Sequence, residues 1–161
     1  MVSLSNSVLK INSSATITMS ALANRLKSEG KDIISLSAGE PDFGTPKHVK
    51  EAAIEAIKAG ETKYTNPDGM PELKEAISQK FVTENNLKYE PSQISVGTGG
   101  KQIIYNALMA TLNPEDEVII PAPYWVSYPD MVKLAGGIPK IIKTASRNNY
   151  KVQANDLRAS I

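Results

Sequence analysis

The sequence contains no cysteine, one histidine and one tryptophan among its 161 residues. Without cysteine the chain has no disulfide, no thiolate metal ligand and no thiol nucleophile, a composition that suits a reducing compartment. The single histidine, His48, rules out a metal site built from several histidines, and its place on the charged side of a predicted helix indicates a solvated residue. Redox chemistry at sulfur and multi-histidine centres are therefore excluded.

The sequence also lacks an excess of charge and a long apolar run. Its 18 basic residues stand against 17 acidic ones, a formal net charge of +1, which gives no electrostatic reason to expect nucleic acid or an anionic membrane as partner. No stretch approaches the roughly 20 apolar residues of a membrane span. Residues 1–14 lack the basic start and apolar run of a signal peptide. We expect a cytoplasmic protein without nucleic-acid or membrane partners.

The hydrophobic pattern predicts an α/β fold. Hydrophobic residues make up 41% and charged residues 22%, as in ordinary globular domains. From residue 93 onward strands and helices alternate, which implies a mainly parallel sheet with covering helices. The expected elements are a strand at 94–96, a helix at 102–112, a strand at 118–120, a helix at 125–135 and a strand at 138–143.

The first part of the chain predicts an arm followed by helices. Residues 1–14 form a polar arm, and helical spacings then continue to Gly30. A short strand at 33–36 runs into a turn-rich loop. Thr45 and Pro46 predict an N-cap and first helical residue, for a helix ending at Gly60, and a second helix begins at Pro71 and ends at Asn85 and Asn86.

The last residues carry an unfinished helix. Asn155 or Asp156 caps it and Leu157 and Ile161 are its first apolar pair, yet little more than one turn is present. We therefore expect the N-terminal part of a longer protein, with a sheet edge and an apolar face left uncovered.

A glycine-rich loop, Gly97–Lys101, lies between a predicted strand and a helix N-terminus. Glycines let backbone amides approach an anion closely, and the helix dipole favours a phosphate there. The loop is not a Walker loop, because Ser95 stands where its first glycine is required, and it is not a dinucleotide fingerprint, because Gln102 replaces the third glycine. A phosphate cradle and a turn needed only for packing both remain open.

Three further positions are candidates with equally plain alternatives. Trp125 follows a strand at the carboxyl edge of the sheet, where its indole suits a flat aromatic cofactor but also a core or a subunit interface. Gly39 either presents its N–H to a carboxylate or forms a turn. Tyr64 either donates its hydroxyl to a phosphate or is a solvated loop tyrosine.

Four motifs occur in order along the chain, namely SAGEPDF (37–43), KYTNPDGMPELKEAI (63–77), GTGGKQIIYNAL (97–108) and PAPYWVSYPDM (121–131). Together they resemble the fold-type I aminotransferases that depend on pyridoxal 5'-phosphate, and most of all the bacterial aspartate aminotransferases. The similarity runs from about residue 10 to the last residue but covers only the first part of the family's length.

The resemblance assigns roles at the cofactor. The backbone amides of Gly99, Gly100 and Lys101 would hold its phosphate, and Trp125 would lie against its ring and also contact the substrate carboxylate. The Schiff-base lysine, which moves the proton, would lie beyond Ile161, so that no catalytic residue is expected in this chain. Lys101 does not take that role, because the resemblance puts it at the phosphate end.

The resemblance also implies a homodimer and two domains. Gly39 would bind the substrate α-carboxylate, and Tyr64 would reach the phosphate of the neighbouring subunit's cofactor. Residues 1–45 would be the N-terminal arm and small-domain segment, and residues 46–161 the first part of the large cofactor-binding domain.

We therefore expect the parent protein to transfer the amino group of aspartate, or a similar amino acid, to 2-oxoglutarate, and the isolated 161-residue chain to be inactive. Asn12 stands where relatives that also accept prephenate tend to have lysine, which favours a dicarboxylic amino acid. The alternative is a truncated, non-catalytic fragment that acts only as a folding or dimerisation unit. A nucleotide-binding module is disfavoured by the two failed glycine fingerprints.

Overall fold

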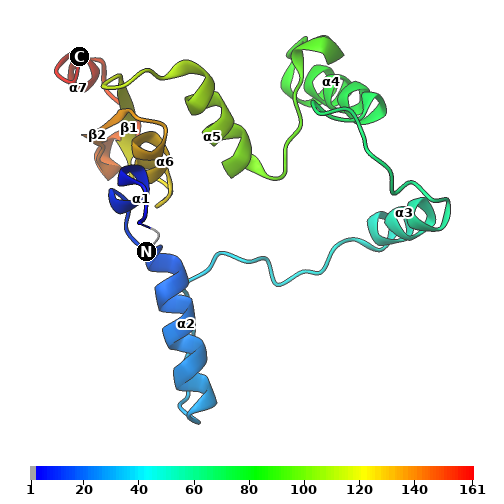
Figure 1. Ribbon diagram of the computed structural model, residues 1–161, viewed down its shortest axis with the longest axis horizontal. Coiled ribbons are helices and arrows are strands. Elements are labelled where there is room, and N and C mark those ends of the chain that lie inside the picture. Colours follow the sequence, from blue (N-terminus) through cyan, green and yellow to red (C-terminus); the bar gives the residue numbers. More distant parts are fainter. Residues whose placement is uncertain (1–2) are drawn as a thin grey trace. The chain divides into compact units, whose positions relative to one another are not determined.

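The computed structural model describes residues 3–161 and divides into two compact units (Figure 1). One unit combines the chain up to Gly39 with Ile104–Ile161, and the other is the continuous segment Glu40–Ile103. Because helix α5 (Gly100–Thr111) runs from the second unit into the first, most of its residues belong to the first.

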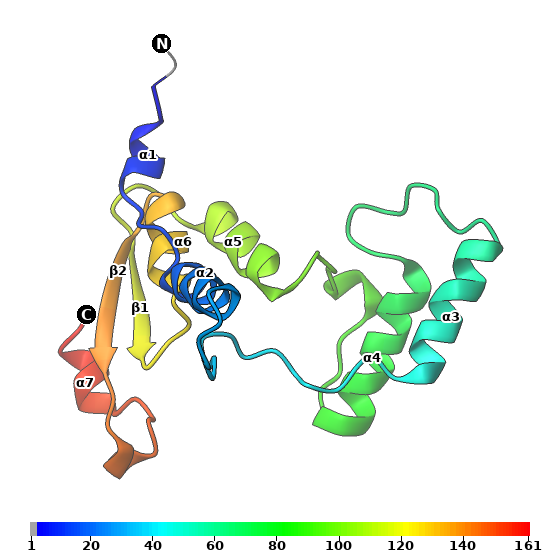
Figure 2. The same cartoon turned by 90° about the horizontal axis from the view of Figure 1, so that it is seen from below.

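The first unit contains the sheet. Strands β1 (Glu117–Ala122) and β2 (Ile138–Lys143) pair in parallel, in a register from Glu117 opposite Ile138 to Ala122 opposite Lys143. Helix α6 (Tyr128–Leu134) connects them, and Figure 2 shows the two arrows side by side. Parallel neighbours require such a crossover. The predicted α/β class with a parallel sheet is confirmed, and the predicted bounds of the strand at 138–143 are those found.

The core of this unit lies between α6 and the sheet. The buried hydrophobic side chains among residues 3–161 are Met131 and Val132 of α6, Ile120 of β1 and Ile142 of β2, and Val132 is only 2% exposed. After the helix the chain turns tightly through Gly137, where a Cβ would lie 3.0 Å from the carbonyl oxygen of Asp116. The close packing of this turn brings β2 directly onto β1.

The remaining helices of the first unit come from both ends of the chain. Ser5 and Ser14 cap helices α1 (Asn6–Leu9) and α2 (Ala15–Ser28), each accepting a backbone N–H three residues on. Near the other end lie the short 3₁₀-helix η2 (Ser146–Asn148) and helix α7 (Ala154–Arg158).

The second unit consists of helices and loops. Its helices are α3 (Lys47–Lys58), α4 (Pro71–Asn85) and the short 3₁₀-helix η1 (Pro91–Gln93). Helix α4 ends at Asn86 in the left-handed conformation, and the chain then returns along it. The Phe81 and Tyr89 rings meet edge to face at 5.8 Å, and the Ser78 hydroxyl donates to the Tyr89 carbonyl at 2.6 Å. These contacts fix the return segment on α4.

Two predicted strands are wrong as sheet elements. Residues 33–36 and 94–96 lie outside the helices and strands, and within residues 3–161 neither segment pairs with a strand. Their sequences are apolar enough for a strand, yet a strand exists only where a neighbour takes its hydrogen bonds. Ile34 and Leu36 are accordingly 86% and 92% exposed.

Two helix starts also differ from the predictions. The helix expected from residue 125 begins at Tyr128, because Trp125 and its neighbours form a turn in which Tyr128 N–H donates to the Trp125 carbonyl at 3.0 Å. Pro46 rather than Thr45 is the N-cap of α3. In the part of the chain that the structure describes, every helix is too short or too polar to cross a membrane.

Candidate functional site

The glycine turn, Gly97–Gly100, depends on glycine most clearly at Gly99, whose φ of +85° residues with a Cβ rarely adopt. A Cβ on Gly97 would lie 2.7 Å from Ile103 Cδ1, the end of a flexible side chain. The Gly99 N–H donates to the Gly97 carbonyl at 2.9 Å, and the Thr98 N–H donates to the Gln102 side chain. Gln102, which breaks the dinucleotide fingerprint, thus stabilises this turn.

Two backbone donors at the end of this turn are free. Across residues 3–161 no atom accepts a hydrogen bond from the N–H of Gly100 or of Lys101, the first two residues of the 12-residue helix α5. A Cβ on Gly99 or Gly100 would meet nothing within 4 Å, so that open space lies beside these two residues. Unpaired amides at the positive end of a helix dipole fit a phosphate group.

The segment that leads into the glycine turn is anchored by a loop that lies earlier in the chain. Val96 donates its N–H to the Asp68 carbonyl at 2.9 Å, and Gly69 packs so closely that a Cβ there would lie 2.8 Å from Val96 Cγ2. The Asp68 carboxylate is paired with the ammonium group of Lys74. A hydrogen bond from Lys74 and its positive charge lower the pKa of Asp68.

Tyr64 lies in the same loop, between α3 and α4, and its side chain is fully exposed. The only histidine, His48, is exposed on α3, as predicted. The sequence analysis did not identify the pair of Asp68 and Lys74, since a lysine in a helix rich in charged residues is expected to lie at the surface. The Asp-Gly pair in the loop was the available signal, because such pairs mark tight turns.

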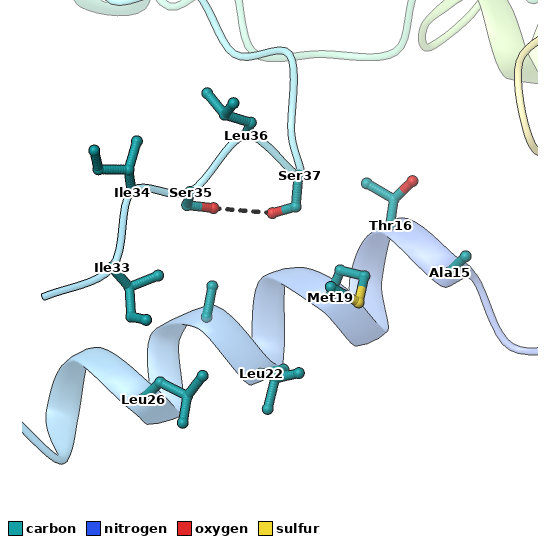
Figure 3. Close-up of a pocket in the computed structure, with 11 residues that line it drawn as sticks. Ala15, Thr16, Met19, Leu22, Leu26, Ile33, Ile34, Ser35, Leu36 and Ser37 are labelled. Atoms are coloured by element: carbon teal, nitrogen blue, oxygen red, sulfur yellow. Dashed lines mark hydrogen bonds between the residues drawn. The ribbon is translucent and has the colours of Figure 1, made fainter. Parts of the chain in front are cut away.

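Gly39 follows a segment that is held on α2. The Ser37 hydroxyl is hydrogen-bonded to those of Ser20 and Ser35, each at 3.0 Å. Between α2 and this segment runs a mainly apolar groove of about 490 Å³ (Figure 3). Leu22, Leu26 and Ile33 are among the residues that line it. Helix α2 therefore determines where the chain reaches Gly39.

Trp125 lies just beyond the carboxyl end of β1, and its side chain is 54% exposed. Trp125 lies in the turn that follows Ala122, the last residue of β1. The Ala122 carbonyl accepts a hydrogen bond at 3.2 Å from the N–H of Thr144, just after β2. The sheet edge thus presents a half-exposed indole at the position where open α/β sheets bind ligands.

Residues 31–161 match the model of the family described as aminotransferase class I and II. The chain belongs to this family. It is 57% identical over 158 residues to the aspartate/prephenate aminotransferase of Cereibacter sphaeroides and 48% identical to the aspartate aminotransferase of a Bacillus species. Both alignments cover 98% of this chain and 40% of the relative.

Solved aminotransferase structures agree with this assignment. The aspartate aminotransferase of Thermus thermophilus with maleate superimposes with a TM-score of 0.95 at 45% identity, and that of Rhizobium meliloti with 0.94 at 49%. Each match covers all of this chain and 42% or 40% of the solved one. The chain thus spans about two-fifths of the length of its aminotransferase relatives.

The residues to which the aminotransferase resemblance gives roles are divided between the two units. Gly99, Gly100, Lys101 and Tyr64 belong to the unit Glu40–Ile103, and Gly39 and Trp125 belong to the unit that contains the sheet. Within the former, the Tyr64 loop and the entry to the glycine turn are joined through Asp68 and Val96.

Proposed function

We propose that this chain is the N-terminal part of a cytoplasmic aminotransferase that moves the amino group of aspartate, or a similar amino acid, to 2-oxoglutarate with pyridoxal phosphate as cofactor. The observation that carries the proposal is the pair of free amides on Gly100 and Lys101, at the start of α5 in a chain of this family. The names of its relatives support aspartate as the amino donor.

The chain's own residues serve to bind and orient. The free amides of Gly100 and Lys101 hold the phosphate together with the Gly99 N–H, which would exchange the Gly97 carbonyl for it, and the α5 dipole stabilises the negative charge. Trp125 covers the cofactor ring and contacts the substrate carboxylate, to which Gly39 offers its N–H. Pyridoxal phosphate, when bound, supplies an electron sink next to the substrate's reacting carbon.

The proposed assembly is a homodimer with shared sites. The exposed Tyr64 donates its hydroxyl to the phosphate in the partner subunit, which fits a side chain that projects from a loop. Residues 1–45 belong to a small domain and residues 46–161 to the first part of a large one. The Schiff-base lysine belongs to the remainder of the parent protein.

The test is amino transfer by the full-length polypeptide that contains this chain. With pyridoxal phosphate bound, the full-length protein should convert aspartate and 2-oxoglutarate into equal amounts of oxaloacetate and glutamate. The formation of oxaloacetate is measured by its reduction in a coupled assay. The 161-residue chain alone should be inactive. Absence of transfer by the cofactor-loaded full-length protein would refute the proposal.

A second amino acceptor, prephenate, distinguishes between the two activities for which the relatives are named, aspartate/prephenate aminotransferase and aspartate aminotransferase. Prephenate should be a poorer acceptor than 2-oxoglutarate, because Asn12 replaces the lysine expected in relatives that accept it. Comparison of kcat/KM for the two acceptors measures this preference. An equal or higher value for prephenate would correct the substrate without affecting the reaction type.

A further inference from the structure

Lys74 is the one charged residue that is buried among residues 3–161, with 8% exposure. A buried ammonium group costs free energy unless an anion and hydrogen bonds compensate it. Its partner is the carboxylate of Asp68, six residues earlier and 54% exposed. The pair therefore connects helix α4 to the loop that precedes it in the chain. It does so at a buried position, where the desolvation of a lysine costs free energy.

Asp68 is the point at which this loop is attached to the rest of its unit. Its carboxylate binds Lys74, and its carbonyl accepts the Val96 N–H at 2.9 Å. The turn around it is closed by the Gly69 N–H, which donates to the Asn66 carbonyl at 3.1 Å. Side chain and backbone thus fix Asp68 against both α4 and the entry to the glycine turn.

Tyr64 lies on the unattached part of the same loop. On one side, the Glu61 N–H donates to the Ala56 carbonyl at 3.1 Å, and on the other side stands Asp68. Between them, Lys63, Tyr64 and Thr65 make no hydrogen bond to any residue from 3 to 161. Four residues span at most about 14 Å between Cα atoms, so the attachment at Asp68 limits how far the backbone that carries the tyrosine can move.

We propose that Asp68 and Lys74 are positioning residues for Tyr64: their ion pair sets the place of the tyrosine hydroxyl and thereby the affinity for the cofactor phosphate. This inference rests on the proposed function, in which Tyr64 donates to that phosphate. The hydrogen bond and the positive charge of Lys74 lower the pKa of the Asp68 carboxyl and so favour its charged form.

The experiment compares two ligands that differ only in the phosphate. Dissociation constants of pyridoxal phosphate and of pyridoxal are measured by absorption titration on the full-length protein. Lys74→Met, which keeps the apolar stem, should weaken pyridoxal phosphate about tenfold or more and leave pyridoxal unchanged, as expected for a lost bond to a charged group. Lys74→Arg should restore the affinity, because it restores the cation.

Two further variants connect the effect to Tyr64 and to its partner. Tyr64→Phe should show the same selective loss, and adding Lys74→Met to it should cause no further loss, because both changes remove one interaction. Asp68→Asn, at a half-exposed carboxylate, tests the pair even where Lys74→Met does not fold. The matched control is Lys58→Met, which breaks the exposed pair with Glu55 at 2.9 Å and should change neither constant.

Several results would overturn the inference. These are an unchanged preference for pyridoxal phosphate in both Lys74→Met and Asp68→Asn, equal weakening of both ligands, or additive losses in the double variant. If the unmodified protein itself binds pyridoxal phosphate no better than pyridoxal, the proposed function fails instead. The two failures are therefore distinguishable.

Discussion

Replacing Gly69 with alanine should loosen the entry to the glycine turn. Gly69 has a φ of +115°, and a Cβ there would lie 2.8 Å from Val96 Cγ2 and 2.9 Å from Val96 Cβ. Real Cβ atoms essentially never approach so closely. Because two of the contacted atoms belong to a stiff β-branched side chain next to the backbone, the overlap is relieved only by moving the turn.

The magnitude follows from two contributions. A residue with a Cβ in such a backbone conformation costs about 1–3 kcal/mol, and overpacking of a tight contact costs about 1–3 kcal/mol. Their sum, about 2–6 kcal/mol, corresponds to at least a thirtyfold change in the local opening equilibrium, since about 1.4 kcal/mol is tenfold. Gly60→Ala is the matched control, because Gly60 has a φ of +80° but nothing within 4 Å of its Cβ position.

Hydrogen exchange resolved to single amides measures the effect. The Val96 N–H is bonded to the Asp68 carbonyl, whereas the N–H of Gly100 has no acceptor among the described residues and serves as an unprotected reference. Protection of the Val96 amide should fall at least thirtyfold in Gly69→Ala and stay unchanged in Gly60→Ala. A Gly69→Ala value within threefold of the unmodified protein would show that the contact with Val96 does not hold the segment.

Three other perturbations have definite expected outcomes. Val132→Ala should lower the free energy of unfolding by about 2 kcal/mol, because a nearly fully buried side chain leaves a cavity; an unchanged thermal midpoint would contradict the placement of the core. Gly99→Ala should weaken pyridoxal phosphate binding, while Gly30→Ala, at a similar φ of +81° in open space, should not; equal affinities in titration would remove the turn from the phosphate site. The pKa of the Asp68 carboxyl is lowered from 3.8 in the folded protein. The ion pair should therefore stabilise the fold fully above pH 3.8, and this stabilisation should be lost as the pH falls through the lower pKa of the folded state. A carbon-detected NMR titration of Asp68 with a midpoint at or above 3.8 would contradict the ion pair.

The sequence predicted those elements whose causes are local. The strand at 138–143 has the bounds found for β2, and Pro71 begins α4, because alternation of strand and helix patterns and a proline at the first helical position act within a few residues. The glycine turn was located for the same reason. Its conformation depends on Gly99, which lies within it.

Features that depend on distant partners were not predictable in this way. Residues 94–96 have the composition of a strand, but Val96 bonds to a loop almost thirty positions earlier instead of to a neighbouring strand. Lys74 is buried only because Asp68 folds back onto it, and nothing in a helix rich in charged residues marks one lysine as different from the others. The exposure of Trp125 likewise depends on a turn that an apolar run does not reveal.

The two unpaired amides at the start of α5 allow anion binding to be detected by NMR on the protein itself. In a sample labelled with nitrogen-15, the resonances of Gly100 and Lys101 should shift when an anion arrives, whereas that of Thr98, already bonded to Gln102, should respond less. Occupancy of the cradle becomes observable at individual atoms, independently of turnover and of any chromophore.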